Sequence, residues 1–147
     1  MFDYFANPTR FVKIADALFW PLVIAASGLL IAGLYYALVA SPADYQQGET
    51  VRIMYVHVPA AWLATLDYVL MGICALFYIV WRHPLADVAL RAMAPVGAVF
   101  AMLTLVTGSL WGKPMWGAWW VWDARLTSML ILFFFYVAVI ALANGFD

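Results

Sequence analysis

The residues best suited to chemistry lie in one tryptophan-rich stretch, residues 111–125 (WGKPMWGAWWVWDAR). It holds five of the chain's 8 tryptophans, together with Lys113, Asp123 and Arg125. Indole rings offer wide apolar faces and one polar N–H, so they suit an oil–water boundary or the face of a planar ligand. A porphyrin fits the second description, because Lys113 and Arg125 can pair with its carboxylates.

The spacing within this stretch predicts two halves of different character. Glycine and proline make the first half irregular, at Gly112, Pro114 and Gly117. From Trp116 onward, aromatic residues and one acid recur at i, i+3, i+4 and i+7, which predicts a short helix with one aromatic face: Trp116, Trp119, Trp120 and Asp123. Two interpretations stay open, a plate that binds a planar ligand and a belt of tryptophans at a membrane interface.

Composition places the chain in a membrane. Of its 147 residues 68% are hydrophobic and 10% charged, whereas soluble domains carry about 25% charged residues. The net charge of −1 and the lack of a basic run disfavour a nucleic-acid partner. The single Cys74 permits no internal disulfide, and no Cys-x-x-Cys-His motif is present for covalent haem attachment.

The elements that must position the tryptophan-rich stretch are apolar runs of membrane-spanning length. They predict an all-α integral membrane protein with one transmembrane domain, residues 1–147, and four spans at about 17–40, 58–81, 92–110 and 126–143. The amphipathic stretch 111–125 joins the third span to the fourth. Both termini then lie on one side of the membrane. That side carries four basic residues and the other side three, which weakly favours cytoplasmic termini.

His57 falls on the same side as the tryptophan-rich stretch. Pro59 suits the first turn of the second span, which would place His57 just before a helix N-terminus. The positive end of the helix disfavours imidazolium there, and neutral imidazole is the form that binds iron. A solvated interfacial histidine is the alternative. His83 falls on the opposite side and is expected to be a solvated loop residue.

Asp67 lies well inside the second span, where a lone charge is costly. Intramembrane acids often mark functional sites, so one interpretation is a proton or ligand site. The other is a neutral carboxyl group hydrogen-bonded to a Thr or Tyr of another helix.

Four segments of this chain closely resemble the haem exporter protein C family (CcmC) of bacterial system I cytochrome c maturation: residues 42–48 (PADYQQG), 55–61 (YVHVPAA), 93–100 (MAPVGAVF) and 105–128. The resemblance covers nearly the whole chain. It implies a multi-pass protein of the bacterial inner membrane, with cytoplasmic termini and a periplasmic site for haem b.

The resemblance also implies roles for particular residues. His57 matches the family's first periplasmic histidine and is expected to be an axial ligand of the haem iron. The tryptophan-rich signature is matched at Trp111, Trp116, Trp119, Trp120, Trp122 and Asp123. We add Arg125 and Lys113 as candidate partners of the haem propionates, from their charge alone.

The expected function is delivery of haem to the haem chaperone CcmE, with CcmD, CcmA and CcmB as further partners. Because the covalent bond forms on the chaperone, this chain is not expected to be an enzyme. Family members have six spans and a second axial histidine after the fourth, which this sequence lacks, so we expect a fragment of a six-helix protein. The alternatives are a haem-lyase subunit of the same superfamily, and a structural ABC-transporter subunit whose tryptophan loop docks another protein.

Overall fold

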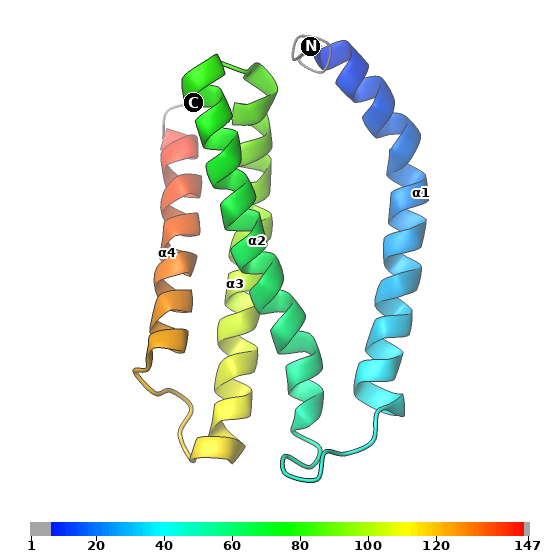
Figure 1. The fold of residues 1–147 in the computed structure, drawn as a ribbon, viewed down its shortest axis with the longest axis vertical. Coiled ribbons are helices and arrows are strands. Elements are labelled where there is room, and N and C mark those ends of the chain that lie inside the picture. Colours follow the sequence, from blue (N-terminus) through cyan, green and yellow to red (C-terminus); the bar gives the residue numbers. More distant parts are fainter. Residues whose placement is uncertain (1–6, 146–147) are drawn as a thin grey trace.

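The computed structural model describes residues 7–145, which form four long helices (Figure 1). Helix α1 (Pro8–Tyr35) continues into a short π-helix, η2 (Tyr36–Ala40), and is followed by α2 (Val51–Trp81), α3 (Pro84–Trp116) and α4 (Ala124–Gly145). Each of the four is long and apolar enough to cross a membrane. The prediction of an all-α integral membrane protein is confirmed.

The helices extend beyond the predicted spans because their capping residues lie further out. The Asn7 side chain accepts a hydrogen bond from the Thr9 N–H at 3.0 Å and starts α1. Helix α2 starts at Val51, so Pro59 lies in its interior and does not open it. Pro59 removes only the helical hydrogen bond to the Tyr55 carbonyl, whereas the apolar residues before it continue the hydrophobic run.

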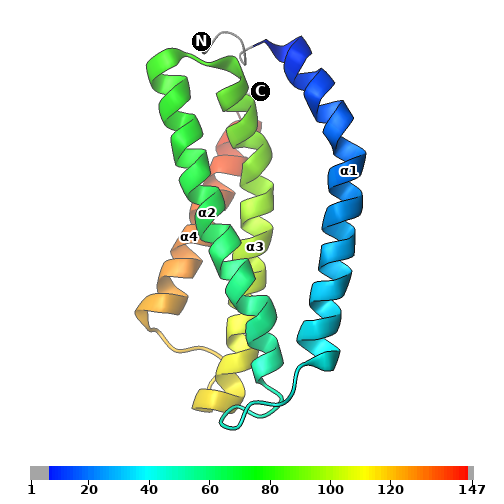
Figure 2. The ribbon, with the colours of Figure 1, turned by 45° about the vertical axis from the view of Figure 1, so that its right-hand side comes forward.

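Helices α2, α3 and α4 pack into a three-helix bundle, while α1 stands apart from them along most of its length (Figures 1 and 2). No residue of α1 is buried. Small side chains let the other three helices approach closely, and the buried cluster consists of Ala64, Met71, Ala94, Ala101 and Tyr136.

The helices of the bundle approach one another closely at Gly97. A Cβ atom there would collide with the ring of Tyr136 and with Oδ2 of Asp67. The Tyr136 hydroxyl donates to the Ala64 carbonyl at 2.6 Å and so joins α4 to α2. Asp67 therefore faces the bundle interior beside a tyrosine of another helix, as the structural interpretation predicts, but its buried Oδ2 atom has no hydrogen-bond partner among the described residues.

The tryptophan-rich segment and the loop between α1 and α2 lie at one end of the bundle, shown at the bottom of Figure 1. The turn between α2 and α3 lies at the other end, near the start of α1 and the end of α4. The prediction that His57 and His83 lie on opposite sides is thus confirmed. His83 lies in the turn before α3, as expected for a loop residue, but it is half-buried at the N-cap and not fully solvated.

Candidate functional site

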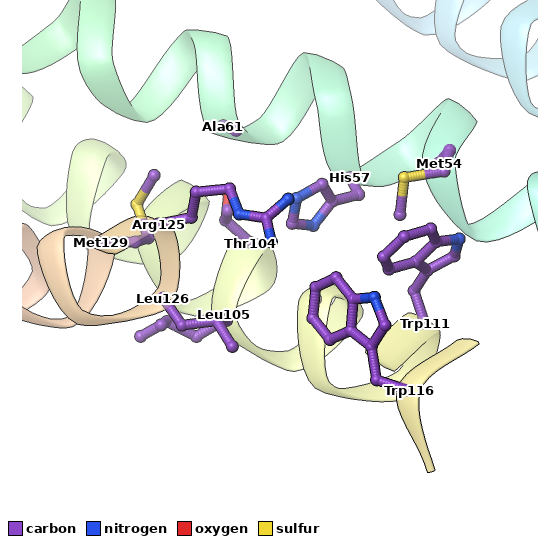
Figure 3. Close-up of a pocket in the computed structure, with 11 residues that line it drawn as sticks. Met54, His57, Ala61, Thr104, Leu105, Trp111, Trp116, Arg125, Leu126 and Met129 are labelled. Atoms are coloured by element: carbon purple, nitrogen blue, oxygen red, sulfur yellow. The ribbon is translucent and has the colours of Figure 1, made fainter. Parts of the chain in front are cut away.

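A cavity of about 340 Å3 opens where α2, α3 and α4 converge at the tryptophan-rich end. Figure 3 shows the side chains that line it. Four of the predicted site residues meet here: His57, Trp111, Trp116 and Arg125. The other lining residues are mostly apolar: Met54, Ala61, Thr104, Leu105, Gly108, Leu126 and Met129.

His57 lies within α2, seven residues into the helix, and not before its N-terminus as predicted. The influence of the helix dipole fades within the first turn, so that argument for a neutral imidazole no longer applies. The ring instead packs on α3. Its Nδ1 atom lies 3.0 Å from the Thr107 hydroxyl oxygen, and its Cε1 atom would be 3.1 Å from a Cβ on Gly108.

The tryptophan-rich segment has the reverse of the predicted pattern. Residues 111–116 complete α3, whereas residues 117–123 have no helical structure. Gly117 ends α3 in the left-handed conformation (φ 76°), and its N–H donates to the Lys113 carbonyl at 3.0 Å. Glycine adopts this conformation without the steric cost of a Cβ. The predicted helix through Trp116, Trp119 and Trp120 was therefore wrong.

The indole rings do not form a flat plate. Trp111 and Trp116 meet edge to face, with ring centroids 5.0 Å apart, and form one wall of the cavity. Trp120 and Trp122 form a second edge-to-face pair at 5.4 Å. Trp119 and Trp122 are 56% and 76% exposed, so these rings face the surroundings of the protein. Only two of the five tryptophans line the cavity.

Asp123 caps the start of α4 and holds the Arg125 side chain beside the cavity. One carboxylate oxygen accepts the Leu126 N–H at 2.9 Å, and the other accepts Arg125 Nε and Nη2 at 3.0 and 2.7 Å. These bonds, first from the Leu126 N–H and then from Arg125, hold the pKa of the Asp123 carboxyl group below its usual value. The Arg125 guanidinium lies 5.1 Å from the centroid of the Trp116 ring.

Sequence reasoning missed the residues that hold the site in place. Trp111 Nε1 donates to Gln47 Oε1 at 2.9 Å, and Gln47 belongs to a tight turn closed by Asp44. Thr107 and Gly108 contact His57 from α3. A glutamine among the polar residues between the first two predicted spans was a possible signal for the contact to Trp111. Nothing in the sequence indicated which face of α3 meets His57.

The sequence as a whole matches one protein family, described as "Heme exporter protein C", over residues 1–147. The chain belongs to the haem exporter protein C family. It is 55% identical to the haem exporter protein C of Bradyrhizobium diazoefficiens over 97% of this chain and 54% of that protein. Identity to the Escherichia coli K12 protein of the same name is 51%, over 97% of this chain and 58% of the relative.

A more distant relative is a candidate cytochrome c biosynthesis protein of Marchantia polymorpha, described as ccmC-like and mitochondrial. It is 46% identical over 89% of this chain and 54% of its own length. The chain thus spans little more than half the length of these haem exporter family relatives.

Proposed function

We propose that this protein binds haem b in the cavity beside His57 and delivers it to the haem chaperone CcmE during cytochrome c maturation. The observation that carries the proposal is the meeting of an imidazole, two indole rings and a guanidinium on one apolar cavity. The names of the relatives support haem as the cargo. The proposed site faces the periplasm at the inner membrane, with the termini in the cytoplasm.

The residues present fit a haem. Its iron accepts an imidazole ligand, and its carboxylates suit an arginine. The cavity volume of about 340 Å3 is near the lower end of the roughly 300–1,000 Å3 typical of small-molecule sites. A cavity of this small volume suits a cargo that is held by one edge and then passed on.

Each residue then has a defined task. His57 would ligate the haem iron, Trp111 and Trp116 would provide apolar ring contacts, and Arg125 would pair with a propionate. Lys113 is a more remote candidate for the second propionate, because its Nζ donates to the Gly117 carbonyl and lies 5.9 Å from the Trp119 ring. The protein acts by binding and orienting haem and not as an enzyme, with CcmD, CcmA and CcmB as partners in the same membrane.

A second candidate function is favoured by the exposure of Trp119 and Trp122 outside the cavity. Exposed aromatic residues are frequent at protein interfaces. The protein would then be a structural subunit of a membrane transporter, and its tryptophan-rich loop would dock another protein without binding haem.

Absorbance of the protein purified from haem-replete membranes separates the two functions. We expect a Soret band that accompanies the protein. We also expect transfer of haem to CcmE, detected by haem stain. His57→Ala should lower haem retention by about tenfold or more, because losing even a hydrogen-bonding partner of a metal ligand typically costs 10–100-fold. His83→Ala is the matched control and should retain haem. A protein without a Soret band would support the docking function.

A further inference from the structure

Thr107 is a polar side chain of α3 that meets the His57 ring. It is buried, with 8% of its surface exposed, and its hydroxyl oxygen lies 3.0 Å from His57 Nδ1. A hydroxyl group carries one hydrogen and two lone pairs. Whether Thr107 donates to His57 or accepts from it therefore depends on where this single hydrogen is used.

The Thr107 hydrogen is already committed to its own helix. Its Oγ1 donates to the Leu103 carbonyl at 2.7 Å, with the Thr104 carbonyl at 3.3 Å as a second acceptor. Both partners are carbonyl oxygens, which only accept. Towards His57 the Thr107 oxygen is thus left as an acceptor, and Nδ1 must carry the ring hydrogen.

We infer that Thr107 is a positioning residue that fixes His57 as the Nδ1–H tautomer and thereby presents Nε2 as the metal ligand. A neutral imidazole has one N–H, so protonation of Nδ1 leaves the lone pair on Nε2. The hydrogen bond to Thr107 also restrains rotation of the ring and makes it a more basic ligand. The inference deepens the proposed function and rests on it for the identity of the metal.

Gly108 makes this contact possible. A Cβ at this position would lie 3.1 Å from His57 Cε1 and 3.4 Å from a methyl carbon of Leu126. The absence of a side chain lets the imidazole approach α3 closely enough to reach Thr107. The ring is therefore held by a hydroxyl group and a glycine on successive residues of one helix.

The tautomer can be measured without haem. The chain has only 2 histidines, so His83→Gln leaves His57 as the only imidazole in a 15N-histidine NMR spectrum. At about pH 8, above the usual histidine pKa of about 6.5, we expect a protonated Nδ1 and an unprotonated Nε2 in the ligand-free protein. Thr107→Ser should keep this pattern. Thr107→Val, which has nearly the same shape but no hydroxyl group, should shift the population towards Nε2–H.

Two NMR results would overturn the inference. One is a predominant Nε2–H tautomer in the parent protein, and the other is an unchanged tautomer in Thr107→Val. The second result would assign the Nδ1 hydrogen to another acceptor. Thermal unfolding of both Thr107 variants, followed by circular dichroism, checks that the fold is retained.

Titration with ferric haem tests the consequence for binding. Thr107→Val should weaken binding by about 10–100-fold, as is typical for loss of a hydrogen bond to a metal-bound histidine, and should shift the Soret band. Thr107→Ser should bind like the parent. A Val variant with altered tautomer but parental haem affinity and spectrum would contradict the positioning role. If His57→Ala left binding unchanged, the proposed ligand would fail, while the NMR result would still decide the tautomer.

Discussion

At the scale of single residues, the tryptophans of the tryptophan-rich segment differ in position, since some line the cavity and others are exposed outside it. Trp116 lines the cavity, whereas Trp122 is exposed outside it. We therefore expect Trp116→Ala to lose more haem than Trp116→Phe, because phenylalanine keeps an aromatic face. An aromatic contact contributes about 0.5–1.5 kcal/mol beyond burial, so the two variants should differ by roughly two- to tenfold in haem retained. Soret absorbance at matched protein concentration measures it.

Trp122→Ala is the control for this comparison and should retain haem almost as the parent does. Equal losses for Trp116→Phe and Trp116→Ala would show that the ring is not a stacking surface. The tryptophans would then act as a membrane-interface belt.

Asp67 is a half-buried acid that faces other side chains of the bundle. Its carboxyl group lies beside Tyr136 and directly over Gly97, within a packed part of the bundle away from the cavity. Asparagine has nearly the same shape as a neutral carboxyl group, so Asp67→Asn should leave haem transfer to CcmE within about twofold of the parent. Haem staining of the chaperone measures this. A folded, membrane-inserted variant that transfers no haem would restore Asp67 as a functional site.

At the scale of secondary structure, the start of α4 depends on Asp123. Asparagine is as good an N-cap as aspartate, so Asp123→Asn should keep the helix start but lose the ion pair to Arg125. Asp123→Ala loses both the N-cap and the ion pair. We expect lower haem retention in both variants and lower thermal stability mainly in Asp123→Ala. Equal unfolding temperatures for the two variants would contradict the capping role.

Acidic pH should weaken the hydrogen bond between the Asp123 carboxylate and the Leu126 amide. Because the pKa of Asp123 is lowered in the folded protein, its contribution to stability is complete above the usual aspartate pKa of about 3.9. That contribution declines as the pH falls below this value, through the lowered pKa. Hydrogen exchange at the Leu126 amide, which donates to Asp123, should therefore gain a protonation-dependent component only in strong acid. Asp123→Asn should lack this component.

The helices could be predicted from the sequence because hydrophobic runs of this length have few alternatives. The ends of the helices could not be predicted, because neighbouring residues gave conflicting signals for where a helix starts or stops. Pro59 resembles a helix start but lies inside α2, and the i, i+3, i+4 spacing after Trp116 was outweighed by Gly117 as a helix end and Asp123 as an N-cap. Of the predicted site residues, four line the cavity: His57, Trp111, Trp116 and Arg125. The contacts of Thr107 with His57 and of Gln47 with Trp111 depend on how the helices and loops face one another. A single sequence does not specify this arrangement.

At the scale of the whole molecule, hydrogen bonds at the tryptophan-rich end of the bundle connect the loop before α2 to η2 and to the cavity wall. Arg52, near the start of α2, donates to the Leu38 and Ser41 carbonyls at the end of η2. The next loop residues hold Trp111 through Gln47. The end of η2, the loop and the cavity wall thus form one hydrogen-bonded unit, although α1 itself remains apart from the bundle.

The distribution of basic residues only weakly predicts which side of the membrane the tryptophan-rich end of the bundle faces. Cysteine labelling tests it directly, after Cys74→Ser removes the single native thiol. Tyr45 is 91% exposed in the loop before α2, Trp122 is 76% exposed in the loop before α4, and Pro84 is exposed at the opposite end of the bundle.

A membrane-impermeant maleimide applied to intact cells should label Tyr45→Cys and Trp122→Cys but not Pro84→Cys, because the proposed delivery to a periplasmic chaperone requires the cavity to face outward. Pro84→Cys should react only after the membrane is permeabilised, which shows that its thiol is accessible. Labelling of Pro84→Cys alone in intact cells would place the cavity in the cytoplasm and rule out the proposed transfer.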